Sequence, residues 1–165
     1  MSIAVTLQET LTVAETLATN VPDVSATNAV VTHNQYNVSV ALSATSSPAV
    51  SLTASFAQGL TAGAATIDFT ALTGTNGATV TGSTKKVIAY IMTNPATNAN
   101  SITITTGASN GLTIFGASGR HVLQPGQSLM SYDPSGLSTT IDATHKTVDL
   151  SGTGAQTLNV IVVMG

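Results

Sequence analysis

The chain has 165 residues, of which 42% are hydrophobic and only 7% are Asp, Glu, Lys or Arg, and its formal net charge is −3 at pH 7. Its four lysines and arginines are too few for a nucleic-acid-binding protein, because such proteins need a cation for each phosphate they neutralise. The hydrophobic content is too high for a disordered chain, and the lack of cysteine excludes disulfides and thiolate metal sites.

The low charge has a consequence for the surface. Soluble domains average about 25% charged residues, so Thr, Ser, Asn and Gln must fill the solvent-facing positions here. Burial of a hydroxyl costs less than burial of an ion, and we therefore expect a homo-oligomer or larger assembly, with a monomer as the alternative.

No targeting or membrane segment is predicted. The N-terminus lacks a basic n-region and carries Glu9 and Glu15 where a signal peptide would be apolar. No apolar run approaches the roughly 18 residues that span a bilayer. We expect a protein made in a cytoplasm, without a membrane partner.

Residues 1–35 are rich in Thr, Ala and Asn, and alternation predicts a first strand only over residues 3–7. The pair Val21-Pro22 interrupts this segment. Two interpretations stay open: an extended N-terminal arm that lies on a neighbouring subunit, or the first strands of the domain. The compact domain is expected to span residues 36–165.

From residue 36 onward, short runs alternate between apolar and polar residues and are separated by Gly, Pro and Asn turns. This spacing predicts an all-β fold, a sandwich, jelly roll or barrel, and we expect an antiparallel β-sandwich that resembles a jelly roll. The continuous apolar run Val87–Met92 predicts a central strand buried on both faces. Alternating runs predict further strands around residues 38–42, 52–56, 67–69, 102–104, 112–114, 148–150 and 158–162.

The histidines and serines form no catalytic pattern. His33, His121 and His145 show neither the HxH nor the HExxH spacing of a zinc site, and no GxSxG nucleophile elbow occurs. We therefore predict that the chain is not an enzyme and needs no cofactor.

Three acids, Asp133, Asp142 and Asp149, gather in the C-terminal third. They lack the DxDxDG spacing of a calcium loop, so a calcium site is only an alternative. Asp133 opens the segment Asp-Pro-Ser-Gly, where an Asp side chain caps a turn. Asp68 lies between two apolar residues and should face away from the core.

Arg120 and His121 follow the turn at residues 116–119. Arginine is over-represented in protein interfaces. We therefore predict that Arg120 and its neighbour His121 lie at an interface. Val21 and Pro22 are predicted interface residues as well, because they belong to the segment that could form an arm.

The C-terminal half carries a series of interstrand segments. They are Thr93-Asn-Pro-Ala-Thr-Asn-Ala-Asn-Ser-Ile-Thr-Ile104, Gly107-Ala-Ser-Asn-Gly111, Phe115-Gly116, Val122-Leu-Gln-Pro-Gly-Gln-Ser128 and Lys146-Thr-Val-Asp-Leu-Ser-Gly-Thr-Gly-Ala-Gln156. In these segments, residues 85–165 resemble small β-sandwich virion structural proteins of tailed bacteriophages, of the capsid decoration or cement type.

The resemblance implies a non-enzymatic virion protein that stabilises the phage head, with the major capsid protein or other virion proteins as partners. It implies no catalytic residues. A tail, fibre or host-receptor-binding module of the virion is the alternative. Residues 1 to about 60 carry no part of the resemblance.

Overall fold

The computed structural model describes residues 3–17 and 29–165, and every regular element among them is a β-strand. The predicted all-β class is therefore confirmed. No helix in the described part of the chain could cross a bilayer. The strands are β1 (Ala4–Leu17), β2 (Ala29–Ser43), β3 (Leu52–Leu60), β4 (Ala64–Asp68), β5 (Leu72–Thr73), β6 (Thr79–Val80), β7 (Val87–Thr93), β8 (Ile102–Thr106), β9 (Arg120–Leu123), β10 (Ser128–Tyr132), β11 (Thr147–Ser151) and β12 (Gln156–Met164).

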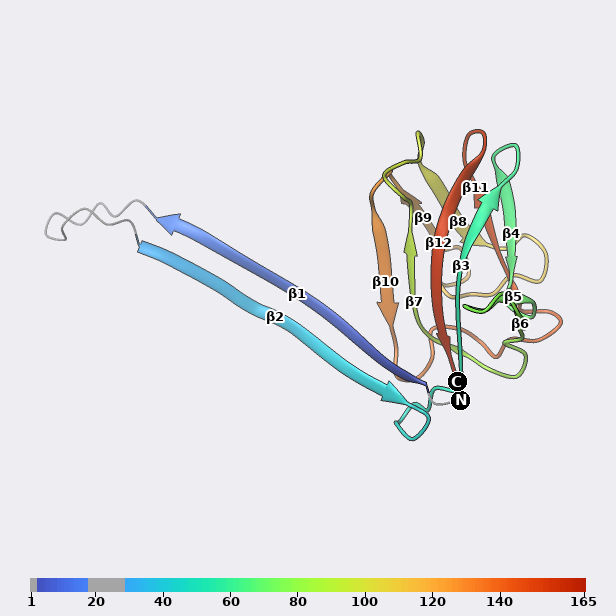
Figure 1. Cartoon of the computed structure of the whole chain (residues 1–165), viewed down its shortest axis with the longest axis horizontal. Helices are drawn as coiled ribbons and strands as arrows, with labels where there is room; N and C mark the ends of the chain where they lie inside the picture. The colour runs from blue at the N-terminus through green and yellow to red at the C-terminus, as the bar shows by residue number, and fades with distance from the viewer. Residues whose placement is uncertain (1–2, 18–28) are drawn as a thin grey trace, which may run out of the picture. The chain divides into compact units, whose positions relative to one another are not determined.

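The chain divides into two units. The smaller unit, Ala4–Leu42, is a hairpin in which β1 and β2 pair and run in opposite directions (Figure 1). The larger unit contains Ile3 and Ser43–Gly165. The boundary expected near residue 36 falls inside β2, because the alternation of residues 38–42 continues a strand that begins at Ala29.

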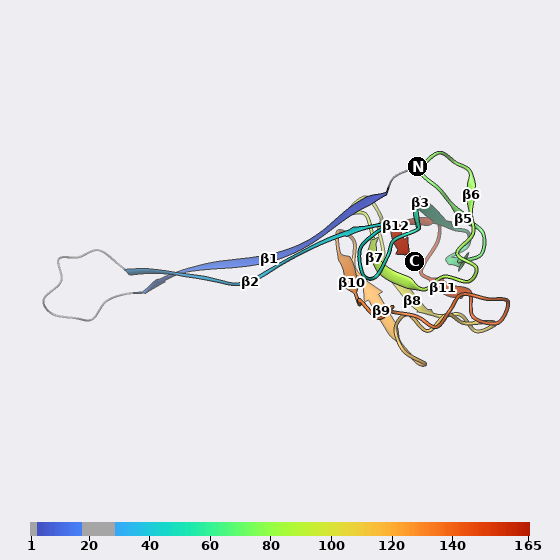
Figure 2. The same ribbon diagram turned by 90° about the horizontal axis from the view of Figure 1, so that it is seen from below.

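The larger unit is a sandwich of two four-stranded sheets, which Figures 1 and 2 show as facing layers. The strand orders are β10-β7-β12-β3 and β4-β11-β8-β9. β3 pairs with β12, β4 with β11, β7 with β10 and β8 with β9, all antiparallel. Among the eight strands of the sandwich, the first therefore pairs with the last, the second with the seventh, the third with the sixth and the fourth with the fifth. This nested pairing is that of a jelly roll. The predicted sandwich is confirmed.

The core between the sheets comes from simple alternation. In β12, Leu158, Val160 and Val162 are at most 1% exposed, whereas Asn159 and Ile161 between them face outward and are exposed. Full burial of an aliphatic side chain contributes about 1.5–3 kcal/mol relative to exposure. The sandwich thus has a continuous hydrophobic core without covalent cross-links.

Strand β7 occupies the interior position that its sequence predicted. It pairs with β10 on one side and with β12 on the other. Residues 87–90 and Met92 are all buried, so apolar side chains are needed on both faces of the strand. The prediction of a central strand at Val87–Met92 is confirmed.

The strand expected around residues 112–114 is wrong. Leu112 and Ile114 are buried, at 0% and 5% exposure, but they belong to a loop. The Leu112 N–H donates to the Thr147 carbonyl over 2.8 Å, and the Ile114 N–H donates to the Leu112 carbonyl over 3.0 Å. The alternation of Leu112 and Ile114 therefore comes from two loop residues whose side chains pack into the core, and not from a strand.

Candidate functional site

The hairpin of β1 and β2 has a polar and an apolar face. Thr10 Oγ1 donates to Asn37 Oδ1 over 3.3 Å, so these two side chains lie on the same face. Strand residues alternate between faces, which places Leu11 and Val13 of β1 and Val38 of β2 together on the opposite face.

This second face carries an apolar strip of six side chains, three of them exposed and three half-buried. We call it the arm stripe, and it comprises Val5, Leu7, Leu11, Val13, Val38 and Val40. Three of these residues, Leu11, Val13 and Val38, are 61%, 46% and 47% exposed and account for three of the five exposed large hydrophobic residues in the described chain. Glu9 falls on the same face by alternation and divides the stripe. Removal of the stripe from water would release hydrophobic free energy.

The hairpin is long for an element with so little packing. β1 contains 14 residues, which corresponds to about 46 Å at ~3.3 Å per residue. Backbone hydrogen bonds join its two strands, but a two-stranded hairpin is at best marginally stable in water without a further layer. Its geometry is suited to docking against another surface.

Most of this hairpin was missed from the sequence. Strands were predicted there only at residues 3–7 and 38–42, because Glu9 and the threonines interrupt the apolar pattern of the first strand. The sequence does contain a pattern that indicates a longer strand, because the apolar residues Leu11 and Val13 continue the odd-numbered series that Val5 and Leu7 begin.

The structure places the predicted interface residues Arg120 and His121 at the start of β9, on opposite faces of their sheet. Arg120 is exposed, and its Nη2 lies 3.4 Å from Thr103 Oγ1. His121 is half-buried, with its ring 5.0 Å from that of Phe115 at an interplanar angle of 60°. Arg120 is therefore placed for an outward contact, while His121 packs against an aromatic ring. Val21 and Pro22 lie outside the described residues.

Asp142, Thr144 and His145 form a compact polar cluster. Asp142 Oδ1 accepts hydrogen bonds from the backbone N–H groups of Thr144 and His145 over 2.7 and 2.8 Å. Thr144 Oγ1 and Asp142 Oδ1 both meet Nδ1 of His145, at 3.0 and 3.2 Å. A catalytic relay requires the hydroxyl and the carboxylate on opposite ring nitrogens, so this arrangement is a capped turn.

The same hydrogen bonds stabilise the ionised carboxylate. The backbone N–H of Thr144 contributes most, followed by the Thr144 hydroxyl, and the pKa of Asp142 falls to about 2. Asp142 is thus a charged turn cap over the whole neutral range.

The structure does not bring together the three acids considered for calcium. Asp149 on β11 accepts hydrogen bonds from Thr66 Oγ1 over 2.7 Å and from the Ala108 N–H over 2.8 Å. Asp133 accepts from the Ser135 N–H over 2.7 Å and caps its turn as predicted. In the part of the chain that the structure describes, no three His, Asp or Glu side chains are grouped to hold a metal.

Asp68 ends β4 and forms an ion pair with Lys146 over 2.9 Å. Thr70 Oγ1 also donates to Asp68 Oδ1 over 2.6 Å. Burial raises the pKa of Asp68, but the bonds from Lys146 and Thr70 outweigh burial and leave this pKa below its ordinary value. The pair ties the end of β4 to the residue that precedes β11.

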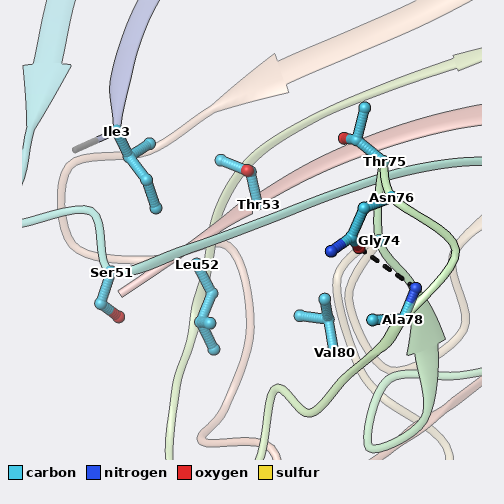
Figure 3. Close-up of a pocket in the computed structure, with 9 residues that line it drawn as sticks. All are labelled: Ile3, Ser51, Leu52, Thr53, Gly74, Thr75, Asn76, Ala78 and Val80. Atoms are coloured by element: carbon cyan, nitrogen blue, oxygen red, sulfur yellow. Dashed lines mark hydrogen bonds between the residues drawn. The ribbon is translucent and has the colours of Figure 1, made fainter. Parts of the chain in front are cut away.

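A cavity of about 510 Å³ lies between the start of β3 and the β5–β6 ribbon (Figure 3). The side chain of Asn76 accepts a hydrogen bond from the Ala78 N–H over 3.1 Å and shapes one wall. Among the described residues, no acid, base or histidine lines this cavity, and its lining combines aliphatic side chains with Ser, Thr and Asn. The lining residues are Ile3, Ser51, Leu52, Thr53, Gly74, Thr75, Asn76, Ala78 and Val80.

Comparison with known proteins identified no relative. A scan against protein-family models gave no match, and neither did a search of curated proteins or of solved structures.

Proposed function

We propose that this chain is a non-enzymatic virion structural protein, a capsid decoration protein that stabilises the phage head by binding the major capsid protein. The observation that carries the proposal is the exposed arm stripe. Leu11, Val13 and Val38 stay in contact with water at 46–61% exposure, on a hairpin whose described residues form no second layer in their own unit. Such a hairpin gains stability when a neighbouring subunit covers it.

The composition of the surface supports an assembly role. Only 7% of residues are charged, and hydroxyl and amide groups can be buried at an interface with a smaller desolvation cost than ions. The jelly roll is also compatible with this role, since it occurs in viral capsid domains as well as in lectins and cupins. Assignment to a virion comes from the resemblance of residues 85–165.

The described polar clusters are consistent with a non-enzymatic protein. The Asp142–His145 cluster caps a turn, and the Asp68–Lys146 pair joins two segments of the sandwich. Each of these groups therefore has a structural role that requires no substrate.

Copy number in purified virions tests the proposal. Quantitative mass spectrometry should find many copies per particle, in fixed ratio to the major capsid protein. A few copies per particle would contradict head decoration, and antibody labelling at the tail tip would support the tail or fibre alternative instead.

A pair of substitutions tests the role of the arm stripe. Leu11→Lys places a charge on the stripe, whereas Thr12→Lys places the same charge on the polar face of the same strand. Binding to capsids that lack the protein should weaken at least about tenfold for Leu11→Lys, as for an interface hot spot, and stay near wild type for Thr12→Lys. Equal binding of the two variants would contradict the proposal.

A further inference from the structure

Two Asn-Gly pairs occur in the chain, Asn76-Gly77 and Asn110-Gly111. This dipeptide is prone to deamidation, because glycine has no side chain to hinder attack by its own backbone nitrogen on the amide of the preceding Asn side chain. Each pair follows a residue with a hydroxyl group, so the two local sequences differ little. A large difference in their reactivity would therefore come from the fold.

The turn at Asn76 holds the groups that would react in hydrogen bonds. The Gly77 N–H donates to the Gly74 carbonyl over 2.9 Å. Asn76 Oδ1 accepts from the Ala78 N–H over 3.1 Å, which fixes the Asn76 side chain. A hydrogen-bonded amide loses its proton only when that bond opens. The attacking nitrogen at this turn is therefore kept in its protonated, unreactive form.

The peptide group between Asn110 and Gly111 is held by its oxygen instead. The Asn110 carbonyl accepts hydrogen bonds from the backbone N–H groups of Lys146 and Thr147, over 2.7 and 2.9 Å. Within residues 3–17 and 29–165, the Gly111 N–H donates no hydrogen bond, and the exposed Asn110 side chain makes none. Both groups that would react are therefore free of competing hydrogen bonds.

The two donors at the Asn110 carbonyl make the Gly111 N–H more acidic. When this N–H loses its proton to solvent base, the negative charge spreads onto the carbonyl oxygen of the same peptide group. Backbone N–H groups about 2.7–3.1 Å away stabilise a developing oxyanion of this kind, and those of Lys146 and Thr147 lie within this range. The fold thus lowers the free energy needed to form the attacking nitrogen.

The backbone of this turn favours the reactive dipeptide. Asn110 has a φ of 54°, which lies in the left-handed region where Asn is enriched. A Cβ at position 111 would collide with the carbonyl oxygen of Gly107. Asn followed by Gly is therefore well suited to the geometry that also promotes the reaction.

We propose that Asn110 is a self-modification site, at which the folded chain converts a neutral side chain to an acid without an enzyme. The deprotonated Gly111 nitrogen forms a bond to Cγ of Asn110. The bond from Cγ to the side-chain nitrogen breaks, and this nitrogen takes up a proton from water and leaves as ammonia. Water then opens the resulting succinimide at one of its two carbonyls, which gives either Asp or isoaspartate.

The two products change the chain in different ways. Either one adds a negative charge to a chain whose formal net charge is −3. Isoaspartate also adds a methylene to the main chain two residues before Leu112, a core residue that is 0% exposed. The modified fraction increases with the age of the protein. This inference concerns the chain alone, so it is independent of the virion role proposed above.

Peptide mapping by mass spectrometry, after incubation of the pure protein in mildly alkaline buffer, measures both sites in one sample. An oxyanion-hole donor contributes about a hundredfold or more to the rate of an enzyme, and for this partly exposed turn we expect succinimide, Asp and isoaspartate to form at least about tenfold faster at Asn110 than at Asn76. In guanidinium chloride the two rates should become similar, and Asn110 should react no faster than in the folded chain.

Three results of this measurement would overturn the proposal. One is a folded chain in which Asn110 reacts no faster than Asn76. Another is an advantage of Asn110 that persists in guanidinium chloride, since the local sequence and not the fold would then be its cause. The third is a slower reaction of Asn110 in the folded chain than in the unfolded chain.

A matched pair of variants provides a second measurement. Asn110→Gly removes the reacting amide and tolerates a positive φ, whereas Asn76→Ser removes the other amide and keeps an oxygen that can cap the turn. On native isoelectric focusing of aged samples, wild type and Asn76→Ser should accumulate an acidic form, and Asn110→Gly should not. Thermal unfolding before incubation verifies that both variants fold. An acidic form that accumulates in Asn110→Gly at the wild-type rate would overturn the proposal.

Discussion

The hairpin and the sandwich use the same alternation of apolar and polar residues to opposite effect. Ile104 and Leu158 in the sandwich are 0% exposed, because a facing sheet covers them. Leu11 on the hairpin follows the same period of two and is 61% exposed. A repeated apolar residue in a strand becomes core or binding surface according to whether the chain supplies a second layer.

The two sets of apolar residues should therefore affect different properties, the stability of the fold in one case and the association of the chain in the other. The apolar residues of the sandwich contribute to the folding of one chain, whereas those of the arm stripe contribute, on our proposal, when a partner covers them. Substitutions in the two regions should therefore change different measurements.

The largest effect is expected in the sandwich core. Ile104→Ala should lower the free energy of unfolding by about 2–5 kcal/mol, because it removes a fully buried side chain and leaves a cavity. Leu11→Ala, on the hairpin, should change the unfolding of the sandwich by less than about 0.5 kcal/mol. Urea denaturation of both variants measures the contrast, and similar losses would show that the hairpin is part of the folding core.

A smaller effect is expected at the polar edge of the sandwich. The depressed pKa of Asp68 means that its ionised form stabilises the fold above the ordinary value of 3.8, and that this contribution is lost as pH falls through the folded pKa. Asp68→Asn should therefore be less stable than wild type at pH 7, by up to about 1 kcal/mol for a partly exposed pair. Urea denaturation should show the two proteins converging in acid, and a gap that widens in acid would contradict the assignment.

The smallest effect is expected at the exposed turn cap. Asp142 should titrate with a midpoint of about 2 instead of 3.8, so any stability that it contributes is lost between these two pH values. Asp142→Asn keeps the oxygen that accepts the backbone N–H bonds and should leave stability at pH 7 close to wild type. An NMR titration of the Asp142 carboxyl group measures the midpoint, and a value near 3.8 would show that the cap is not formed.

The sandwich was more predictable from sequence than the hairpin, for a physical reason. Strands such as β7 and β12 bury apolar residues in unbroken series, and the series is visible in the sequence. Leu112 and Ile114 alternate without forming a strand, because a loop can bury two alternating residues while its backbone bonds to Thr147. Short strands such as β9 and β10 were not predicted, since four or five residues carry too little pattern.

The candidate site was less predictable because it depends on which residues remain uncovered. Arg120 was chosen for its residue type, and the structure places it on an exposed outer face. The pairing of Thr10 with Asn37, which reveals the faces of the hairpin, joins residues far apart in the sequence and has no sequence signature. Exposure of Ile161, and burial of Val163 on the same face, depend on what covers that face, which alternation cannot show.

Amide hydrogen exchange in the dilute chain and in the assembled state tests most directly whether the hairpin depends on a partner. The amides of β7 and β12 should be protected in both states, because they lie in the interior of a packed sheet. The amides of β1 and β2 should exchange rapidly in the dilute chain and become strongly protected on assembly. Protection of β1 and β2 in the dilute chain equal to that of β12 would contradict this account.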